Sequence, residues 1–331
     1  MRKRSSIFAT ADTTCQSVVN KSDVIYVAGH RGLVGSAIVR RLEKGGFSNI
    51  VVRGRSELDL TDSGSVGAFF DETSPDRVFL AAARVGGIAA NDAFPVEFLL
   101  DNLKIQNNVL EHAHRTGVDK LLFLGSSCIY PRMAPQPIAE DCLLTGPLEK
   151  TNQAYAIAKI AGLKLVEAYH AQYGRDFISA MPTNLYGPYD NFDLETSHVL
   201  PALLRKFHEA KTTGADSVEV WGTGKPLREF LHVDDLADAC VFLMNHYSEP
   251  GLINVGYGDE ISIGDLARLI AGTVGFGGTL EFNTSRPDGT PRKLMDSSRL
   301  FAMGWKPSIT LEEGIASTYS WALKHEFVGD T

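Results

Sequence analysis

The chain has 331 residues, of which 44% are hydrophobic and 22% charged, a composition typical of a globular protein large enough for two domains. Its net charge of −8 argues against nucleic acid or an anionic membrane surface as a partner. No run approaches the roughly 18 apolar residues that a membrane span requires, so no membrane partner is expected either.

The first 22 residues predict an N-terminal tail. They are polar and rich in serine and threonine, and no long apolar stretch follows the basic start, so a secretory signal is not expected. A transit peptide is the alternative. The cysteines show no disulfide or zinc spacing, which predicts a reducing, cytoplasmic location and no metal site. They are Cys15, Cys128, Cys142 and Cys240.

A strand, a glycine turn and a helix follow the tail. Residues 24–28 are apolar and β-branched and predict a buried strand, while residues 36–45 predict a helix that ends in glycine. The turn between them reads G-x-x-G-x-x-G, which differs from the G-x-G-x-x-G fingerprint but has the strand–turn–helix context of a dinucleotide site. Glycines allow backbone to approach a pyrophosphate at a helix N-terminus. The alternative is an ordinary turn. The predicted cofactor-binding residues are Gly29, His30, Arg31, Gly32, Leu33, Val34 and Gly35.

The second predicted strand, residues 49–53, ends without the acidic residue that would hold the ribose 2′-hydroxyl of NAD. Arginines lie there instead, and a guanidinium can bind a 2′-phosphate through paired hydrogen bonds. NADP(H) is therefore the predicted cofactor, with Arg31 and Arg55 at the phosphate. The alternative is that both are solvated loop arginines.

Strands predicted at residues 77–83 and 120–125 flank a helix at about 95–116. Alternating strands and helices predict an α/β fold with a Rossmann-like, doubly wound parallel sheet and a smaller C-terminal α/β substrate-binding lobe. We expect the NADP-binding domain at 23–183 with 229–258, and the lobe at 184–228 with 259–331.

Tyr155 and Lys159 are four residues apart in a predicted helix, so their side chains share one face. An ammonium beside a phenol favours the phenolate, so we expect Lys159 to lower the pKa of Tyr155 and to make it a useful proton donor. Ser126 follows a strand end, and its hydroxyl could polarise the same carbonyl oxygen. Taken singly, the Tyr–Lys pair could be a chance surface pair and the serine a helix cap.

Together these segments resemble the extended short-chain dehydrogenase/reductase family, and more narrowly its members that convert GDP-4-keto-6-deoxy-D-mannose to GDP-L-fucose. The resemblance runs from about residue 23 to the C-terminus. The Tyr155–Lys159 spacing marks the superfamily only, whereas Ser-Ser-Cys at 126–128 and Ser-His-Val-Leu-Pro at 197–201 are more specific. The segments that carry it are 28–36, 82–88, 124–131, 155–162, 181–188, 197–202, 228–235 and 287–293.

The resemblance implies epimerisation at C3 and C5 and NADPH-dependent reduction of the C4 ketone. Tyr155 would be the general acid at the C4 carbonyl, Lys159 would tune it and contact the nicotinamide ribose, and Ser126 would share the carbonyl oxygen. Cys128 and His198 would form the acid–base pair, because a ketone acidifies its neighbouring C–H bonds and both side chains titrate near neutrality. An acidic stretch at 192–195 precedes His198, so we expect the pKa of His198 to be raised.

The same resemblance implies further contacts and a homodimer that pairs through helices at about 97–116 and 153–172. Each contact residue alone would more readily be a core, turn or ion-pair residue. The implied cofactor-binding residues also include Leu124, Gly125, Ser126, Ser127, Lys159, Pro182, Thr183, Asn184, Leu185 and His198. The implied GDP-sugar contacts are Lys206, Trp221, Arg228 and Asp288.

Two other classes of function stay open. One is another extended-family nucleotide-sugar epimerase, reductase or dehydratase, although a simple C4 epimerase would need NAD and no Cys–His pair. The other is a non-catalytic NADP-binding regulatory protein, which fold alone does not exclude but which would not need an intact Ser126, Tyr155 and Lys159.

Overall fold

A computed structural model describes residues 19–286 and 288–327 of the chain. The first 18 residues of the predicted tail lie outside the described residues. Among the helices described, none combines the length and the apolar character needed to cross a membrane.

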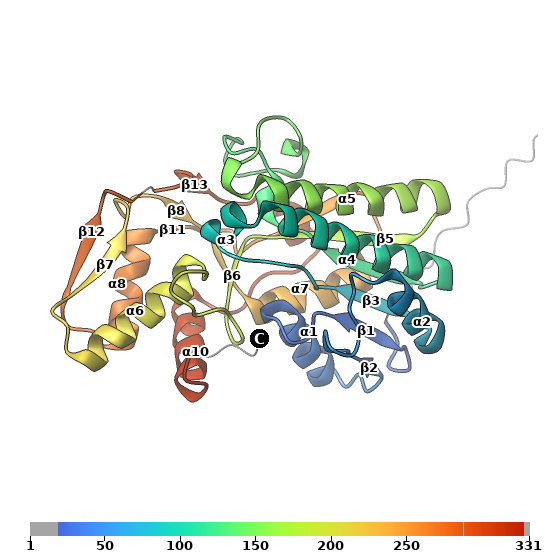
Figure 1. Cartoon of the computed structure of the whole chain (residues 1–331), viewed down its shortest axis with the longest axis horizontal. Helices are drawn as coiled ribbons and strands as arrows, with labels where there is room; N and C mark the ends of the chain where they lie inside the picture. Colours follow the sequence, from blue (N-terminus) through green and yellow to red (C-terminus); the bar gives the residue numbers. More distant parts are fainter. Residues whose placement is uncertain (1–18, 287, 328–331) are drawn as a thin grey trace, which may run out of the picture.

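A six-stranded parallel sheet forms the centre of the molecule (Figure 1). Its four-residue strands are buried throughout, as expected for a parallel sheet covered on both faces. In spatial order the strands are β10 (Leu252–Val255), β5 (Asp176–Pro182), β4 (Lys120–Leu124), β3 (Arg77–Leu80), β1 (Ile25–Ala28) and β2 (Ile50–Val51).

Helices cover both faces of this sheet, because successive strand residues point to opposite sides. Ile25 and Val27 pack with α1 (Leu33–Lys44) and α7 (Val233–His246). Tyr26 packs on the other face. That face is covered by α2 (Ser63–Thr73), α4 (Pro95–Thr116) and α5 (Gln153–Tyr173). The predicted doubly wound α/β fold is confirmed.

Smaller sheets and three helices gather at one end of the molecule, on the left in Figure 1. Their apolar side chains form a separate buried cluster that includes Leu204, Phe207 and Val220. The helices are α6 (Val199–Thr213), α8 (Ile263–Val274) and α10 (Leu311–Lys324). The strand pairs are β7 (Ser217–Trp221) with β12 (Thr279–Asn283) and β6 (Asn184–Tyr186) with β9 (Phe230–His232). The third sheet joins β8 (Leu227–Arg228), β11 (Ile261–Ser262) and β13 (Arg292–Lys293). The exact domain boundaries stay a prediction.

The predicted elements are found, with shifted ends. The helix predicted at 95–116 coincides with α4, whereas α1 begins at Leu33, three residues before the predicted start. The strand predicted at 77–83 ends at Leu80, and only Ile50–Val51 pair in the one predicted at 49–53. Residues beyond these strand ends form the loops at the carboxyl edge of the sheet, where ligands bind in such folds.

Candidate active site

The glycine turn after β1 is built too tightly for side chains at two of its positions. Gly29 has φ +86°, and a Cβ atom there would lie 2.8 Å from the Cα of Ala82. A Cβ atom at Gly35 would collide with the carbonyl oxygen of Gly29. At Gly32 the nearest protein atom would be 3.6 Å away, so packing within the protein does not require glycine there. A pyrophosphate that approaches the backbone at the start of α1 would require glycine at this position.

Two arginines and one unpredicted acid lie beside this turn. The guanidinium of Arg31 flanks Gly54, where a Cβ atom would lie 3.2 Å from its Cζ atom. Arg55 is exposed on the same loop. Sequence analysis missed Glu57, whose carboxylate accepts a hydrogen bond from the Gly54 N–H at 2.6 Å. The Glu57 carboxylate is thus already engaged by a backbone N–H group. The residues present fit a 2′-phosphorylated dinucleotide.

The loops at the ends of β4 and β5 meet closely. A Cβ atom at Gly125 would collide with the side chain of Met181, so only glycine lets these two strand ends approach. The Thr183 N–H donates to the Val255 carbonyl at 3.0 Å, which ties the end of β5 to β10. The predicted cofactor-binding residues at 124–127 and 182–185 therefore lie on neighbouring strand ends.

Ser126, Cys128 and Tyr155 meet directly after β4. Ser126 precedes a short 3-10 helix (Ser127–Ile129), and its Oγ atom accepts from the Cys128 N–H at 3.4 Å. A hydrogen bond with Ser126 lowers the pKa of the Cys128 thiol and of the Tyr155 hydroxyl, against a larger effect of burial on each. The Phe98 ring packs edge-on against Tyr155 with centroids 6.3 Å apart. The structure thus brings together the residues predicted to polarise and protonate a carbonyl.

The expected direction of the Tyr155 pKa is wrong. Burial raises the pKa of the phenol above its ordinary value, and the nearby Cys128 adds to that rise. The Lys159 ammonium lies 5.8 Å from the Tyr155 ring centroid and donates to the Leu124 carbonyl at 2.8 Å. Loss of water around the phenolate therefore decides the direction of the shift in the Tyr155 pKa. Burial also lowers the pKa of Lys159 to about 8.

His198 is the residue that precedes α6, and its pKa is lowered rather than raised. Loss of water around the imidazole is the larger cause and the positive charge of Lys293 the smaller one. The expectation that the acidic stretch at 192–195 would raise this pKa is wrong. The Asp193 carboxylate is bound within its own loop, where it accepts from the Thr196 hydroxyl at 2.8 Å and from the Glu195 N–H at 3.1 Å.

Lys293 is a site residue that sequence analysis did not assign. It lies on β13 opposite Arg228 of β8. Burial lowers the pKa of Lys293, and the negative charge of a Cys128 thiolate would partly restore it. Its own charge lowers the pKa values of Cys128 and His198, so this one ammonium acts on both members of the predicted acid–base pair. The only signal in the sequence was the segment 287–293, in which Asp288 alone was given a role; Pro287 itself lies outside the described residues.

The Glu229 carboxylate, which is fully buried, fixes the positions of Arg228 and Lys293. One oxygen accepts from the N–H groups of Tyr257 and Gly258 at 2.7 and 2.8 Å, and the other from the Met295 N–H at 3.1 Å. Burial raises the pKa of Glu229 while these bonds lower it. The donors follow β10 of the large sheet and β13 of a small one, so the carboxylate joins the two.

The predicted substrate-binding residues lie along the same small sheets. Trp221 ends β7 and is 51% exposed, with the Lys206 Nζ atom 4.9 Å from its ring centroid. Burial lowers the pKa of Arg228. The nearby Asp288 carboxylate opposes that lowering. Both oxygens of Asp288 are engaged, since they accept from the N–H and hydroxyl of Thr223 at 2.6 and 2.8 Å. Asp288 therefore holds the turn after Trp221, and its direct contact with a ligand stays a prediction.

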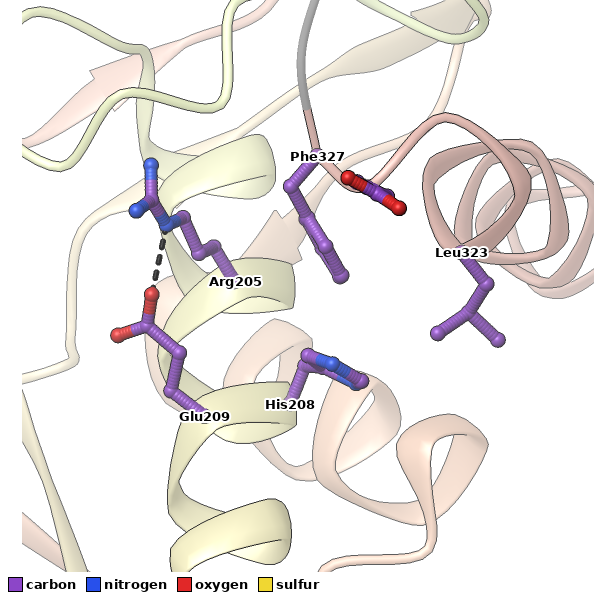
Figure 2. A pocket seen from close by; sticks show the side chains of 6 residues that line it. Arg205, His208, Glu209, Leu323 and Phe327 are labelled. Carbon is purple, nitrogen blue, oxygen red and sulfur yellow. Dashed lines mark hydrogen bonds and ion pairs between the residues drawn. The ribbon is translucent and has the colours of Figure 1, made fainter.

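A pocket of about 360 Å³ lies elsewhere, between α6 and α10 (Figure 2). Three of its polar groups, those of Arg205, His208 and Glu209, already have partners. Arg205 donates to Glu209 at 2.7 Å, and His208 lies 3.0 Å from the Tyr319 hydroxyl. No predicted site residue lines it. Among the described residues, no group of His, Cys, Asp and Glu side chains has the arrangement of a metal site.

The lowered pKa of Lys159 can be tested by measuring the stability of the protein at two pH values. Below about pH 8 this lysine is charged both folded and unfolded, and burial of the ammonium destabilises the folded state. As the pH rises from about 8 toward the usual lysine pKa of about 10.4, the folded protein loses this proton first and the destabilisation fades. Lys159→Met should therefore increase the free energy of unfolding more at pH 7 than at pH 10, as measured by urea denaturation.

Lys164→Met is the matched control for that comparison, because Lys164 is half exposed on the same helix and pairs with Glu167. It should change stability by similar small amounts at both pH values. A stability change for Lys159→Met that does not depend on pH would contradict the assignment.

Known proteins resemble the chain over most of its length. Residues 25–256 match the NAD dependent epimerase/dehydratase family. GDP-L-fucose synthase 1 of Arabidopsis thaliana is 58% identical over 316 residues, covering 96% of this chain and 98% of that protein. Two solved structures superpose with TM-scores of 0.88. One is a GDP-6-OMe-4-keto-L-xylo-heptose reductase from C. jejuni, 41% identical and covering 93% of this chain and all of that one. The other is a GDP-L-fucose synthetase from Naegleria fowleri bound to NADP, which is 33% identical and covers 97% of this chain and 98% of that one. The chain belongs to the NAD dependent epimerase/dehydratase family.

Proposed function

We propose that this protein converts GDP-4-keto-6-deoxy-D-mannose to GDP-L-fucose, by epimerisation at C3 and C5 and NADPH-dependent reduction of the C4 ketone. The observation that carries the proposal is the meeting of Ser126, Cys128 and Tyr155 at one strand end, with Lys293 acting on both Cys128 and His198. The identity of 58% with a GDP-L-fucose synthase supports this substrate over the sugar of the 41% identical heptose reductase.

The glycine turn from Gly29 to Gly35 would hold the pyrophosphate of NADP(H), and Arg31 with Arg55 would hold its 2′-phosphate. The solved relative that carries NADP supports this cofactor. When bound, NADPH supplies the hydride for reduction. Thr183 and Asn184 follow the end of β5, and Lys159 of α5 donates to the Leu124 carbonyl at the end of β4, so these residues would line its nicotinamide end.

Ser126 and Tyr155 would donate hydrogen bonds to the C4 oxygen of the sugar. That oxygen gains negative charge when a proton leaves C3 or C5 and again when the ketone is reduced, so the same two donors serve all three steps. The raised pKa keeps Tyr155 protonated until it gives its proton to the C4 oxyanion. At neutral pH Lys159 is still mostly charged, since its pKa is about 8, and can stabilise the resulting phenolate.

Cys128 and His198 would exchange the protons on carbon. The lowered pKa of His198 keeps the imidazole neutral and able to accept a proton. Burial raises the pKa of Cys128 and keeps the thiol able to donate one. One inversion would leave an imidazolium and a thiolate, and the ammonium groups of Lys293 and Lys159 stabilise the thiolate. Loss of a proton from the imidazolium to water and uptake of a proton from water by the thiolate would ready the pair for the second inversion.

Replacement of the acid tests the proposed reduction. Tyr155→Phe keeps the ring against Phe98 but removes the hydroxyl, and loss of a general acid typically lowers turnover about 10²- to 10⁴-fold. NADPH oxidation at 340 nm should fall by that factor, while NADPH binding, followed by its fluorescence, should persist. Tyr173→Phe, at an exposed position of the same helix, should change neither. Normal turnover by Tyr155→Phe would refute the role.

We also propose a homodimer that pairs through α4 and α5, which lie side by side along one surface of the molecule (Figure 1). Leu100 of α4 and Ile157 of α5 are large apolar residues, 46% and 44% exposed. Such a surface is typical of an interface between helices. Because α5 also carries Tyr155 and Lys159, pairing there would steady the acid. A cytoplasmic location stays a prediction from the cysteine pattern.

Charged residues on that surface should separate the subunits, because each would bury an unpaired charge at the interface. The double variant Leu100→Glu, Ile157→Glu should have the mass of one 36.0 kDa chain by light scattering, and the wild type twice that mass. Leu323→Glu is the matched control, since Leu323 is 47% exposed on α10, and should leave the mass unchanged. A wild-type monomer, or a double variant of unchanged mass, would reject the proposed interface.

A further inference from the structure

Four cations line the smaller sheets although the chain as a whole carries a net charge of −8. Lys293 acts on Cys128, and Arg228 lies opposite it on the neighbouring strand. Arg228 is near Asp288, which holds the turn that follows Trp221. Lys206 and Arg286 lie over the indole of Trp221. The positive charges thus extend from the predicted acid–base pair to Trp221.

Arg286 is the member of this row to which no role has been given. Its Cζ atom lies 4.8 Å from the Trp221 ring centroid, compared with 4.9 Å for the Lys206 Nζ atom. Burial lowers the pKa of Lys206 most, the Glu219 charge raises it, and the charge of Arg286 lowers it by a smaller amount, so the two cations repel each other. Within the residues that the structure describes, no carboxylate lies within ion-pair distance of either cation. An anion between them would relieve the repulsion.

The backbone turn that carries Arg286 is well defined. Strand β12 pairs with β7 so that Asn283 lies opposite Trp221. The Asn283 side chain accepts from the N–H and hydroxyl of Ser285 at 3.0 and 2.6 Å and donates to Glu219 at 3.0 Å. Its carbonyl accepts from the Arg286 N–H at 3.2 Å. These bonds direct the chain after β12 back over the end of β7, which brings the guanidinium to the indole.

We propose that Arg286 is a further substrate-binding residue, which Trp221 holds beside Lys206 to bind the diphosphate of the nucleoside diphosphate sugar. The inference rests on the function proposed above, because it takes the sugar to lie at Cys128 and the nucleotide toward Trp221. It assigns Trp221 a positioning role, since both cations already lie over the indole and a base could stack on an occupied face only by displacing one of them. A guanidinium suits this position because it can stack on a ring and bind phosphate oxygens at the same time.

Binding of GDP and inosine diphosphate by the full-length protein, measured by calorimetry, tests this assignment. The two nucleotides share the diphosphate and differ in the exocyclic amine of the base. Arg286→Met should weaken both by the same factor, about tenfold or more for the loss of a charge-assisted hydrogen bond. Arg286→Lys should recover part of the affinity. In turnover assays Arg286→Met should raise KM with little change in kcat, because the diphosphate is remote from the reacting carbons.

Arg268→Met is the matched control, since Arg268 is an exposed arginine of α8 that pairs with Asp265. It removes the same charge and should leave nucleotide affinity unchanged. Loss of GDP affinity without loss for inosine diphosphate would assign Arg286 to the base and overturn the proposal. Unchanged affinity of Arg286→Met for GDP would also overturn it. Failure of the wild-type protein to bind GDP would instead reject the proposed function and this inference with it.

A double-mutant cycle tests the role of Trp221. If the indole acts by holding the guanidinium, Trp221→Leu combined with Arg286→Met should weaken GDP binding little more than either change alone. Trp221→Phe keeps a ring face and should retain most of the affinity. Additive losses in the double variant would mean that Trp221 binds the nucleotide independently, and would reject the positioning role.

Discussion

The buried carboxylate of Glu229 is the constraint on which the site depends. An ionised carboxylate without partners in a protein interior is strongly destabilising, so its three N–H donors must stay in place. Those donors follow strands of both the large and a small sheet. Displacement of one sheet against the other would leave the charge unpaired. The same carboxylate therefore holds Arg228 and Lys293 at a fixed distance from the ends of β4 and β5, where the reacting groups lie.

Burial sets the protonation states around this junction. The phenol of Tyr155 and the thiol of Cys128 are kept neutral, and the pKa of Lys159 is brought to about 8. Groups that are neutral at rest can give protons, and the ammonium groups beside them stabilise the charges that remain. This arrangement of neutral donors beside ammonium groups explains how one pair of oxyanion donors can serve two proton exchanges and a reduction. A site for an anionic substrate can exist in this acidic protein because Lys206, Arg228, Arg286 and Lys293 gather beside the small sheets.

Local features could be predicted from the sequence. The glycine turn, helix α4 and the shared face of Tyr155 and Lys159 each follow from spacing within one segment. Features that depend on distant segments could not. The placement of Lys293 requires β13 to pair with β8, and the engagement of Asp288 joins it to Thr223, 65 residues away. The pKa of Tyr155 was mispredicted for the same reason, because spacing reveals a neighbouring charge but not the loss of water around both groups.

Isotope incorporation by the wild-type protein tests the central claim, that one oxyanion site serves epimerisation and reduction. The reaction of GDP-4-keto-6-deoxy-D-mannose with NADPH would be run in heavy water, with cofactor oxidation followed at 340 nm and the product analysed by NMR. The expected product is a fucose that carries deuterium at both C3 and C5, formed in step with NADPH consumption. Reduction without deuterium at those carbons would contradict it, and would leave a plain C4 reductase in which Cys128 and His198 move no protons.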